Sequence, residues 1–145
     1  MLRLALSQEL DALKQNQIPK ILWPNLTHLH QLTANNAFPY EIAVEGRVVA
    51  ERVADKLCDL NDCKVQSSDL YHKINSLREK LADPVDWVIS YLQLLRVIGN
   101  LGVHAPFRES LTEQDALAVL VSVQRVLDFI SKSTIRPTDG QTAPV

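Results

Sequence analysis

The chain has 145 residues, of which 46% are hydrophobic and 22% are charged, and its formal net charge at pH 7 is −2. This length and composition are those of one globular domain with a sizeable buried core. The negative balance lacks the broad basic surface of a sequence-independent duplex binder, and four glycines are too few for an all-β fold with many tight turns.

Residues 1–38 carry two short helical patterns. Leucines spaced four and three residues apart predict a first helix over residues 6–13, which must end before Pro19 because proline disfavours helix in the preceding residue. A second helix is predicted over residues 24–35 by the apolar stripe Leu22, Leu26, Leu29 and Leu32. His28 and His30 are two residues apart, so they point to different sides of this helix, and we expect both at the surface.

The N-terminal sequence does not have the form of a secretory signal. Glu9 and Asp11 interrupt its apolar segment, and no small-residue cleavage site follows. No apolar run in the chain approaches the roughly 18–20 residues that span a bilayer. We therefore expect a cytoplasmic protein without membrane contact.

One long helix is predicted over residues 39–60. Pro39 suits the first position of a helix, and the stripe that follows consists of Ile42, Val49, Val53, Leu57 and Leu60. Arg47 and Glu51 are four residues apart, which is typical of a solvated ion pair. The alternative is that this helix packs beside the helix of Arg96 and contributes a charge to the same cleft.

Cys58 and Cys63 are the only cysteines. They are five residues apart, and His72 is the only other candidate ligand nearby in the sequence, so a zinc site would lack ligands. We interpret both as partly buried free thiols in a reducing cytosol. Neither a metal nor a cofactor is expected.

Two further helices are predicted after the loop "NDCKVQSS". Ser67 or Ser68 is expected to cap a helix over residues 70–81, with the apolar stripe Leu70, Ile74, Leu77 and Leu81. Pro84 is expected to open the next helix, whose inward side carries Val88, Leu92 and Leu95.

The last predicted helix begins after Thr112, the expected N-cap, and runs to about Ser131. Its segment "ALAVLVSVQ", residues 116–124, is apolar on more than one face, which indicates either a central helix of a bundle or a buried dimer face. The polar sequence beyond it, with its prolines and glycine, predicts a disordered tail over residues 132–145.

These patterns predict an all-α fold. Four main helices over residues 39–131 form an antiparallel helical bundle, and residues 1–38 add one or two extra N-terminal helices as an extension.

The stretch "LLRVIGNLGVHAPF", residues 94–107, interrupts this regular pattern with two glycines. Each glycine in a helix costs about 1 kcal/mol relative to alanine. Gly99 and Gly102 therefore indicate either a close approach of another helix or a positive-φ exit from this one.

Arg96, Asn100 and His104 follow one another at intervals of four residues and are the candidate site residues. On a continuous helix they lie on one side, and arginine has the reach to meet histidine at a phosphate. Histidine is suited to proton transfer near neutral pH. The alternative is structural, with His104 meeting the last carbonyls of the helix and Asn100 acting as a cap.

The order of four motifs resembles a known family. These are "VEGRVVAERVADKL", "LYHKINSLREKL", "LLRVIGNLGVH" and "LTEQDALAVLVSVQRVLDFI". The set is similar to a bacterial domain-of-unknown-function family that is often appended to restriction-enzyme subunits and is grouped with the HEPN (higher eukaryotes and prokaryotes nucleotide-binding) superfamily. The resemblance covers about residues 39–131.

The resemblance implies a bundle of four to five helices that often dimerises, and in many HEPN proteins a metal-independent ribonuclease site. Carried over to this chain, Arg96 would neutralise the scissile phosphate, His104 would act as general base or acid on the 2′-hydroxyl of the RNA, and Asn100 would orient it.

This chain departs from the ribonuclease pattern because Gly99, not arginine, directly precedes Asn100, and Arg96 lies one turn too early. We therefore expect a helical module that binds a nucleotide, RNA or a partner protein, is a homodimer, and acts in a bacterial restriction or phage-defence setting with a restriction or antitoxin partner. The alternative is a HEPN-type endoribonuclease that uses Arg96 and His104.

Overall fold

The computed structural model describes residues 2–13, 18–63, 69–81 and 86–135, and within these ranges the chain is helical and contains no strand. The predicted all-α class is confirmed. In chain order the elements are α1 (Leu2–Ala12), the 3-10 helix η2 (Lys20–Leu22), α2 (Trp23–Ala34), α3 (Pro39–Leu60), α4 (Leu70–Lys80), α5 (Trp87–Val103), the one-turn α6 (Ala105–Arg108) and α7 (Glu113–Ile135). None of these described helices is both long and apolar enough to cross a membrane.

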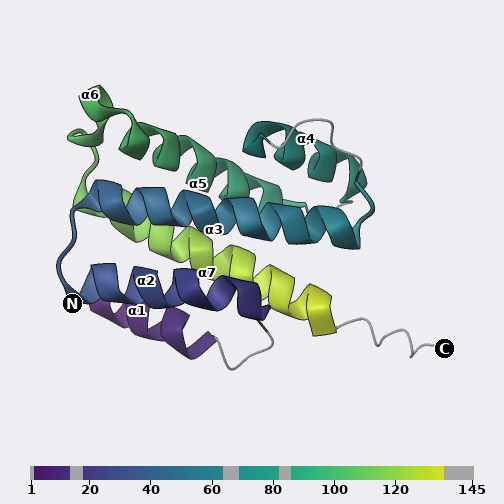
Figure 1. Ribbon diagram of the computed structural model, residues 1–145, viewed down its shortest axis with the longest axis horizontal. Helices are drawn as coiled ribbons and strands as arrows, with labels where there is room; N and C mark the ends of the chain where they lie inside the picture. Colours follow the sequence, from purple (N-terminus) through teal and green to yellow (C-terminus); the bar gives the residue numbers. More distant parts are fainter. Residues whose placement is uncertain (1, 14–17, 64–68, 82–85, 136–145) are drawn as a thin grey trace.

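Helix α3 is the central element. It contacts α2, α4, α5 and α7, while α5 and α7 also contact each other. Figure 1 shows α5 running back along α3, with α4 beside the C-terminal end of α3 and α6 at the opposite end. Helix α1 packs against α2 and α7 and so lies on the far side of α7 from α5.

The buried apolar side chains form one core that includes the N-terminal helices. Leu10 of α1 and Leu26 and Leu29 of α2 are as fully buried as Val53 of α3 and Leu120 of α7. Helices α1 and α2 of the predicted extension therefore pack onto α3 and α7 and share their core.

The helix starts follow from local chemistry. Pro39 is the first residue of α3, as predicted, and the Glu41 carboxylate accepts a hydrogen bond of 2.9 Å from the backbone N–H of Phe38. The predicted cap of α7 is also confirmed. The backbone N–H of Thr112 donates to the Asp115 carboxylate at 2.8 Å, and the N–H of Asp115 donates to the Thr112 hydroxyl at 3.3 Å.

The start of α4 differs from the prediction. Its N-cap is Asp69, whose carboxylate accepts from the backbone N–H of Tyr71 at 3.3 Å. Asp69 has the same capping chemistry as serine and stands one residue nearer the helix. Ser67 and Ser68, the predicted caps, and Pro84, the predicted start of the next helix, lie outside the described residues; α5 begins at Trp87, after Asp86.

Helix α7 continues to Ile135 and not only to Ser131. Residues 132–135 therefore belong to the helix, contrary to the predicted tail over 132–145. Phe129 and Ile130 keep the last turns against the core, and this packing outweighs the weak helix preference of the β-branched residues that follow. The rest of the predicted tail, residues 136–145, lies outside the described residues.

The two histidines of α2 do point to different sides, as predicted, but only one of them is well exposed. The exposed one, His28, accepts or donates a hydrogen bond of 2.8 Å between Nδ1 and the Glu45 carboxylate of α3. His30 is half-buried, and its Nδ1 lies 2.7 Å from the Ser7 hydroxyl of α1. The second surface assignment was wrong because α1 covers that side of α2.

Candidate functional site

The glycines of the α5 motif allow α3 and α5 to approach each other closely. A Cβ atom placed on Gly99 would lie 2.4 Å from the Cβ of Arg47, and one on Gly102 would lie 3.1 Å from the carbonyl oxygen of Tyr40. No glycine in the described residues has a positive φ. Of the two predicted reasons for these glycines, the structure supports close helix packing.

Arg96 is directed toward α4. Its Nε donates a hydrogen bond of 2.8 Å to the Gln93 side chain, one turn earlier on α5. Its guanidinium carbon lies 5.2 Å from the centroid of the Tyr71 ring, which is a cation–π contact. Both partners draw the charged group away from the C-terminal end of α5.

His104 ends α5 and starts α6. Its backbone is extended, with φ −95° and ψ 108°, and its carbonyl accepts hydrogen bonds from the N–H groups of Phe107 and Arg108 at 2.8 and 3.1 Å. Its side chain is exposed, and Asn100 one turn earlier is half-buried. Arg96 lies within α5, whereas His104 follows Val103, the last residue of this helix. The contacts of the Arg96 guanidinium are with Gln93 and Tyr71, and the joint site of Arg96 and His104 stays a prediction.

The solvent side of α5 carries an apolar stripe. Leu94, Val97 and Leu101 follow Ser90 at intervals of four, three and four residues, which is the spacing of a helix–helix seam. The side of α5 that faces α3 is occupied by other residues, among them Leu95 and the two glycines. Val97 is 48% exposed although the stripe is apolar. Asn100 borders this stripe on the side of Arg96, and His104 lies beyond the end of α5.

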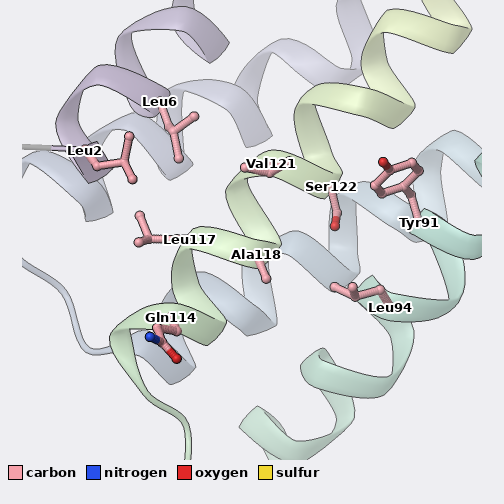
Figure 2. Close-up of a pocket in the computed structure, with 9 residues that line it drawn as sticks. All are labelled: Leu2, Leu6, Tyr91, Leu94, Gln114, Leu117, Ala118, Val121 and Ser122. Atoms are coloured by element: carbon pink, nitrogen blue, oxygen red, sulfur yellow. The ribbon is translucent and has the colours of Figure 1, made fainter.

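The same side of the molecule contains an apolar groove of about 480 Å³ between α1, α5 and α7. Figure 2 shows Leu2 and Leu6 of α1 on one wall, Tyr91 and Leu94 of α5 on the other, and Leu117 and Val121 of α7 between them. None of the nine residues that line the groove is charged. Leu2 and Val121 are 59% and 40% exposed.

Polar contacts hold the α1 wall of this groove in place. The Arg3 guanidinium binds both carboxylate oxygens of Glu113 at the start of α7, at 2.8 and 2.5 Å, and also donates to the carbonyl of Ala37 at 2.8 Å. Further along, the Gln124 amide donates to the Glu9 carboxylate at 2.8 Å. The groove is thus a preformed feature and not a gap left by a loosely attached helix.

The predicted two-sided apolar character of residues 116–124 has a structural explanation. Ala116, Val119, Leu120 and Val123 face the core, whereas Leu117, Ala118 and Val121 line the groove. The sequence indicated a second apolar face on this helix. It did not indicate that Leu2, Leu6 and Tyr91 join the face, because nothing local in α1 specifies where that helix docks.

Arg47 forms the predicted pair with Glu51, with Nη1 3.1 Å from the carboxylate. The alternative also has structural support in part, since α3 does pack beside α5 at this position and the Arg47 stem lies over Gly99. Arg96, however, faces α4, so the two guanidinium groups have separate surroundings.

These features define an all-helical domain with an apolar groove on one side. The sequence model of a domain of unknown function (DUF4145) matches residues 33–138, which is more than half of the chain, and the protein belongs to this family. A search of the curated proteins found no match to the chain, and a search of the solved structures found none either. The predicted family is confirmed at this level, while the HEPN relationship and the association with restriction enzymes stay predictions.

Proposed function

We propose that this protein is a helical interaction module that forms a homodimer through its outer face. The outer face consists of Leu94, Val97 and Leu101 of α5, Leu117 and Val121 of α7, and Leu2 and Leu6 of α1. The observation that carries the proposal is the uncharged, apolar and open lining of the groove on this face. A contiguous apolar surface of this kind typically marks a protein interface.

The charge of the outer face favours a second copy of the chain as the occupant. In a two-fold dimer each residue of the interface meets the same surface of the partner, so a face with charges of one sign repels its copy. A face without charges can be its own complement. Phosphate groups of a nucleic acid find no cation among the residues that line this groove.

The chain's own remaining segments are poor candidates for the groove. The stretches outside the described residues are Met1, "KQNQ", "KVQSS", "ADPV" and "RPTDGQTAPV". None contains two consecutive large apolar residues. The α5 stripe, in contrast, has the spacing that suits packing against another helix of the same pattern.

Exposed positions on this face allow a test that spares the fold. Val97→Glu and Val121→Glu each place a charge on a side chain that is 48% or 40% exposed in the single chain, so neither should disturb the core. We expect wild-type protein to sediment as a dimer of the 16.3 kDa chain and each variant to shift to the monomer, because a buried unpaired charge is costly.

Ile21→Glu is the matched control, since Ile21 is 61% exposed on η2, away from the outer face. Sedimentation velocity over a range of concentrations is the measurement. A wild-type protein that stays monomeric, or a dimer that survives both valine variants, refutes the proposal.

The ligand-binding side of the function rests on the resemblance to HEPN domains. Asn100 borders the outer face, and the exposed His104 follows the end of α5. In a dimer through this face, RNA or a nucleotide would contact these groups next to the seam. The exposed His104 side chain also keeps the ribonuclease alternative open. RNA cleavage in EDTA that disappears in His104→Ala would favour the enzyme, and no cleavage by wild type would favour the binding module.

We further propose that the protein works in the bacterial cytoplasm in a restriction or phage-defence setting. The two free thiols, Cys58 and Cys63, support a reducing compartment. The setting follows from the family resemblance. A gene neighbourhood with restriction–modification or toxin–antitoxin genes would support it, and one confined to unrelated metabolism would oppose it.

A further inference from the structure

A second cavity, of about 430 Å³, lies where α2, α3, the end of α5 and α6 meet. It shares no lining residue with the groove of the outer face. Its walls combine the apolar side chains of Leu32 of α2 and Val44 of α3 with the polar groups of His28 of α2 and Arg108 of α6. Its volume falls in the range that small-molecule sites occupy.

His28 is held in a fixed orientation at this cavity. Its Nδ1 lies 2.8 Å from one oxygen of Glu45, while the other oxygen of that carboxylate accepts a hydrogen bond of 2.7 Å from the Asn25 amide. A carboxylate at Nδ1 fixes the tautomer of the imidazole and leaves Nε2 as its second polar atom. Glu45 has only 12% of its side chain exposed, and each of its carboxylate oxygens has one of these contacts.

Arg108 brings a cation to the cavity without a carboxylate partner. Its guanidinium lies over the ring of Tyr40, with 4.8 Å between the guanidinium carbon and the ring centroid. Its Nε is buried and has no hydrogen-bond partner among the described residues. The guanidinium forms no ion pair with any acidic side chain in the described ranges. An arginine that lies at a cavity without an anionic partner is suited to a planar oxyanion.

The two acidic residues of the cavity, Glu41 and Glu45, accept hydrogen bonds from other groups and form no ion pair with Arg108 in the described ranges. Glu45 is engaged by Asn25 and His28, and Glu41 accepts from the backbone N–H of Phe38 as part of the α3 cap. Arg108 is therefore the lining charge that remains without a polar partner.

We infer that this cavity binds a small organic anion. Its phosphate or carboxylate group pairs with Arg108, its apolar or aromatic body lies against Leu32 and Val44, and a polar group meets Nε2 of His28. His28 and Asn25 precede the segment that matches the family, residues 33–138, so the N-terminal helices complete a site whose other walls belong to the family domain. The site differs from the outer face and does not depend on dimerisation.

Calorimetric titration with AMP, adenosine and benzoate tests the inference and separates the two kinds of anion. We expect AMP or benzoate to bind and adenosine, which lacks the anionic group, to bind at least about tenfold more weakly, because hydrogen bonds to charged groups contribute strongly. Binding of AMP alone assigns a phosphate ligand, and binding of benzoate alone assigns a carboxylate.

Two variants of the full chain locate the binding. Arg108→Gln should lower the affinity for the anion at least about tenfold. His28→Gln should also lower this affinity, and it should leave the fold intact because the His28 side chain is 52% exposed. Arg125→Gln is the matched control, because this guanidinium also lies over an aromatic ring, 4.5 Å from the Trp87 centroid, but outside the cavity.

Val97→Glu separates this inference from the proposed dimer, since that variant should lose the dimer and keep anion binding. The inference is overturned if neither anion binds, if adenosine binds as tightly as AMP, or if Arg108→Gln and His28→Gln both bind like wild type.

Discussion

Gly99 lies where α5 has room for a hydrogen atom and not for a methyl group. A Cβ at this position would be 2.4 Å from the Cβ of Arg47 and 3.1 Å from the carbonyl of Ala43, and backbone atoms cannot easily yield. Gly99→Ala should gain about 1 kcal/mol in helix propensity but lose more by overpacking, for a net destabilisation of roughly 1–3 kcal/mol. Urea unfolding measures this difference.

Gly102→Ala is the graded control, with its nearest neighbours at 3.1 Å, and should cost less than Gly99→Ala. Arg47→Ala should not rescue Gly99→Ala, because alanine keeps the Cβ atom that causes the clash. A Gly99→Ala variant more stable than wild type would contradict the close packing of α3 on α5.

The buried Cys58 thiol should make the free energy of unfolding decrease at alkaline pH. Burial, together with the neighbouring Cys63 thiol and Asp55, raises the pKa of the Cys58 thiol from 9.0 to about 12. The thiol loses its proton above about pH 9 in the unfolded chain, but only near pH 12 in the folded chain. The contribution of Cys58 to the free energy of unfolding is therefore complete below pH 9 and is lost as the pH rises. The folding equilibrium constant should fall by up to about tenfold per pH unit in this window because of this one group.

Other groups also titrate at high pH, so the measurement is the difference between variants. Urea unfolding of reduced Cys58→Ala from pH 8 upward should show a flatter pH dependence than wild type, while Cys63→Ala should keep most of the slope because burial is the largest cause of the shift. Equal slopes for wild type and Cys58→Ala would disprove the burial of an un-ionised thiol.

At the residue scale, the sequence identified the two glycines of α5 as unusual, but it did not indicate which residues of other helices contact this segment. The spacing of Arg96, Asn100 and His104 is a property of one helix and was readable in the chain. The direction of Arg96 depends on Tyr71, which α4 brings into place from 25 residues earlier in the sequence, and no local pattern encodes that contact.

At the scale of elements, the helices with strong start signals were the best predicted. The bounds of α3 match the prediction at both ends, because Pro39 sets its start and the apolar stripe stops at Leu60. Where several residues offer the same chemistry, as Ser67, Ser68 and Asp69 do, the sequence left the cap undecided. The one-turn α6 was missed because four residues are too few for a periodic pattern.

The attachment of α1 depends on a small number of polar contacts near its N-terminus. Arg3 is only 12% exposed and binds Glu113 through two nitrogens, so Arg3→Met removes charge-assisted hydrogen bonds while keeping most of the side-chain volume. Backbone amides of α1 should then exchange with deuterated solvent about tenfold faster, with little change in α3.

Lys132→Met is the control, since Lys132 is 74% exposed and its pair with Asp128, at 3.3 Å, lies within one helix. Unchanged protection of α1 in Arg3→Met would mean that Leu10 and the Ser7–His30 contact alone hold the helix, and the α1 wall of the groove would not depend on Arg3.

At the scale of the whole molecule, the helical periodicity of the sequence predicted the fold class. It did not predict how the helices pack against one another. Helical spacing gave the helices and their inward sides, which made the all-α class predictable. The groove requires α1, α5 and α7 to lie side by side, and the packing that arranges them joins residues about 90–120 positions apart, such as Leu2 with Tyr91 and Val121. The predicted dimer face on α7 became a specific surface only with that arrangement.

The two proposals divide the molecule between two sites. The groove between α1, α5 and α7 has no charged lining residue and is the proposed site for a second copy, while the cavity of His28 and Arg108 is the proposed site for an anion. Asn100 borders the outer face, and His104 lies just beyond the end of α5. A homodimer would thus carry one anion site per chain in addition to whatever its seam contacts.

The use of the outer face as the dimer interface is tested most directly by isotope-filtered NMR on a mixture of labelled and unlabelled chains. We predict intermolecular NOEs from the methyl groups of Leu94, Val97 and Val121, and none from the exposed methyl groups of Ile21. Intermolecular NOEs that arise elsewhere on the protein, or their complete absence at millimolar concentration, would contradict the account.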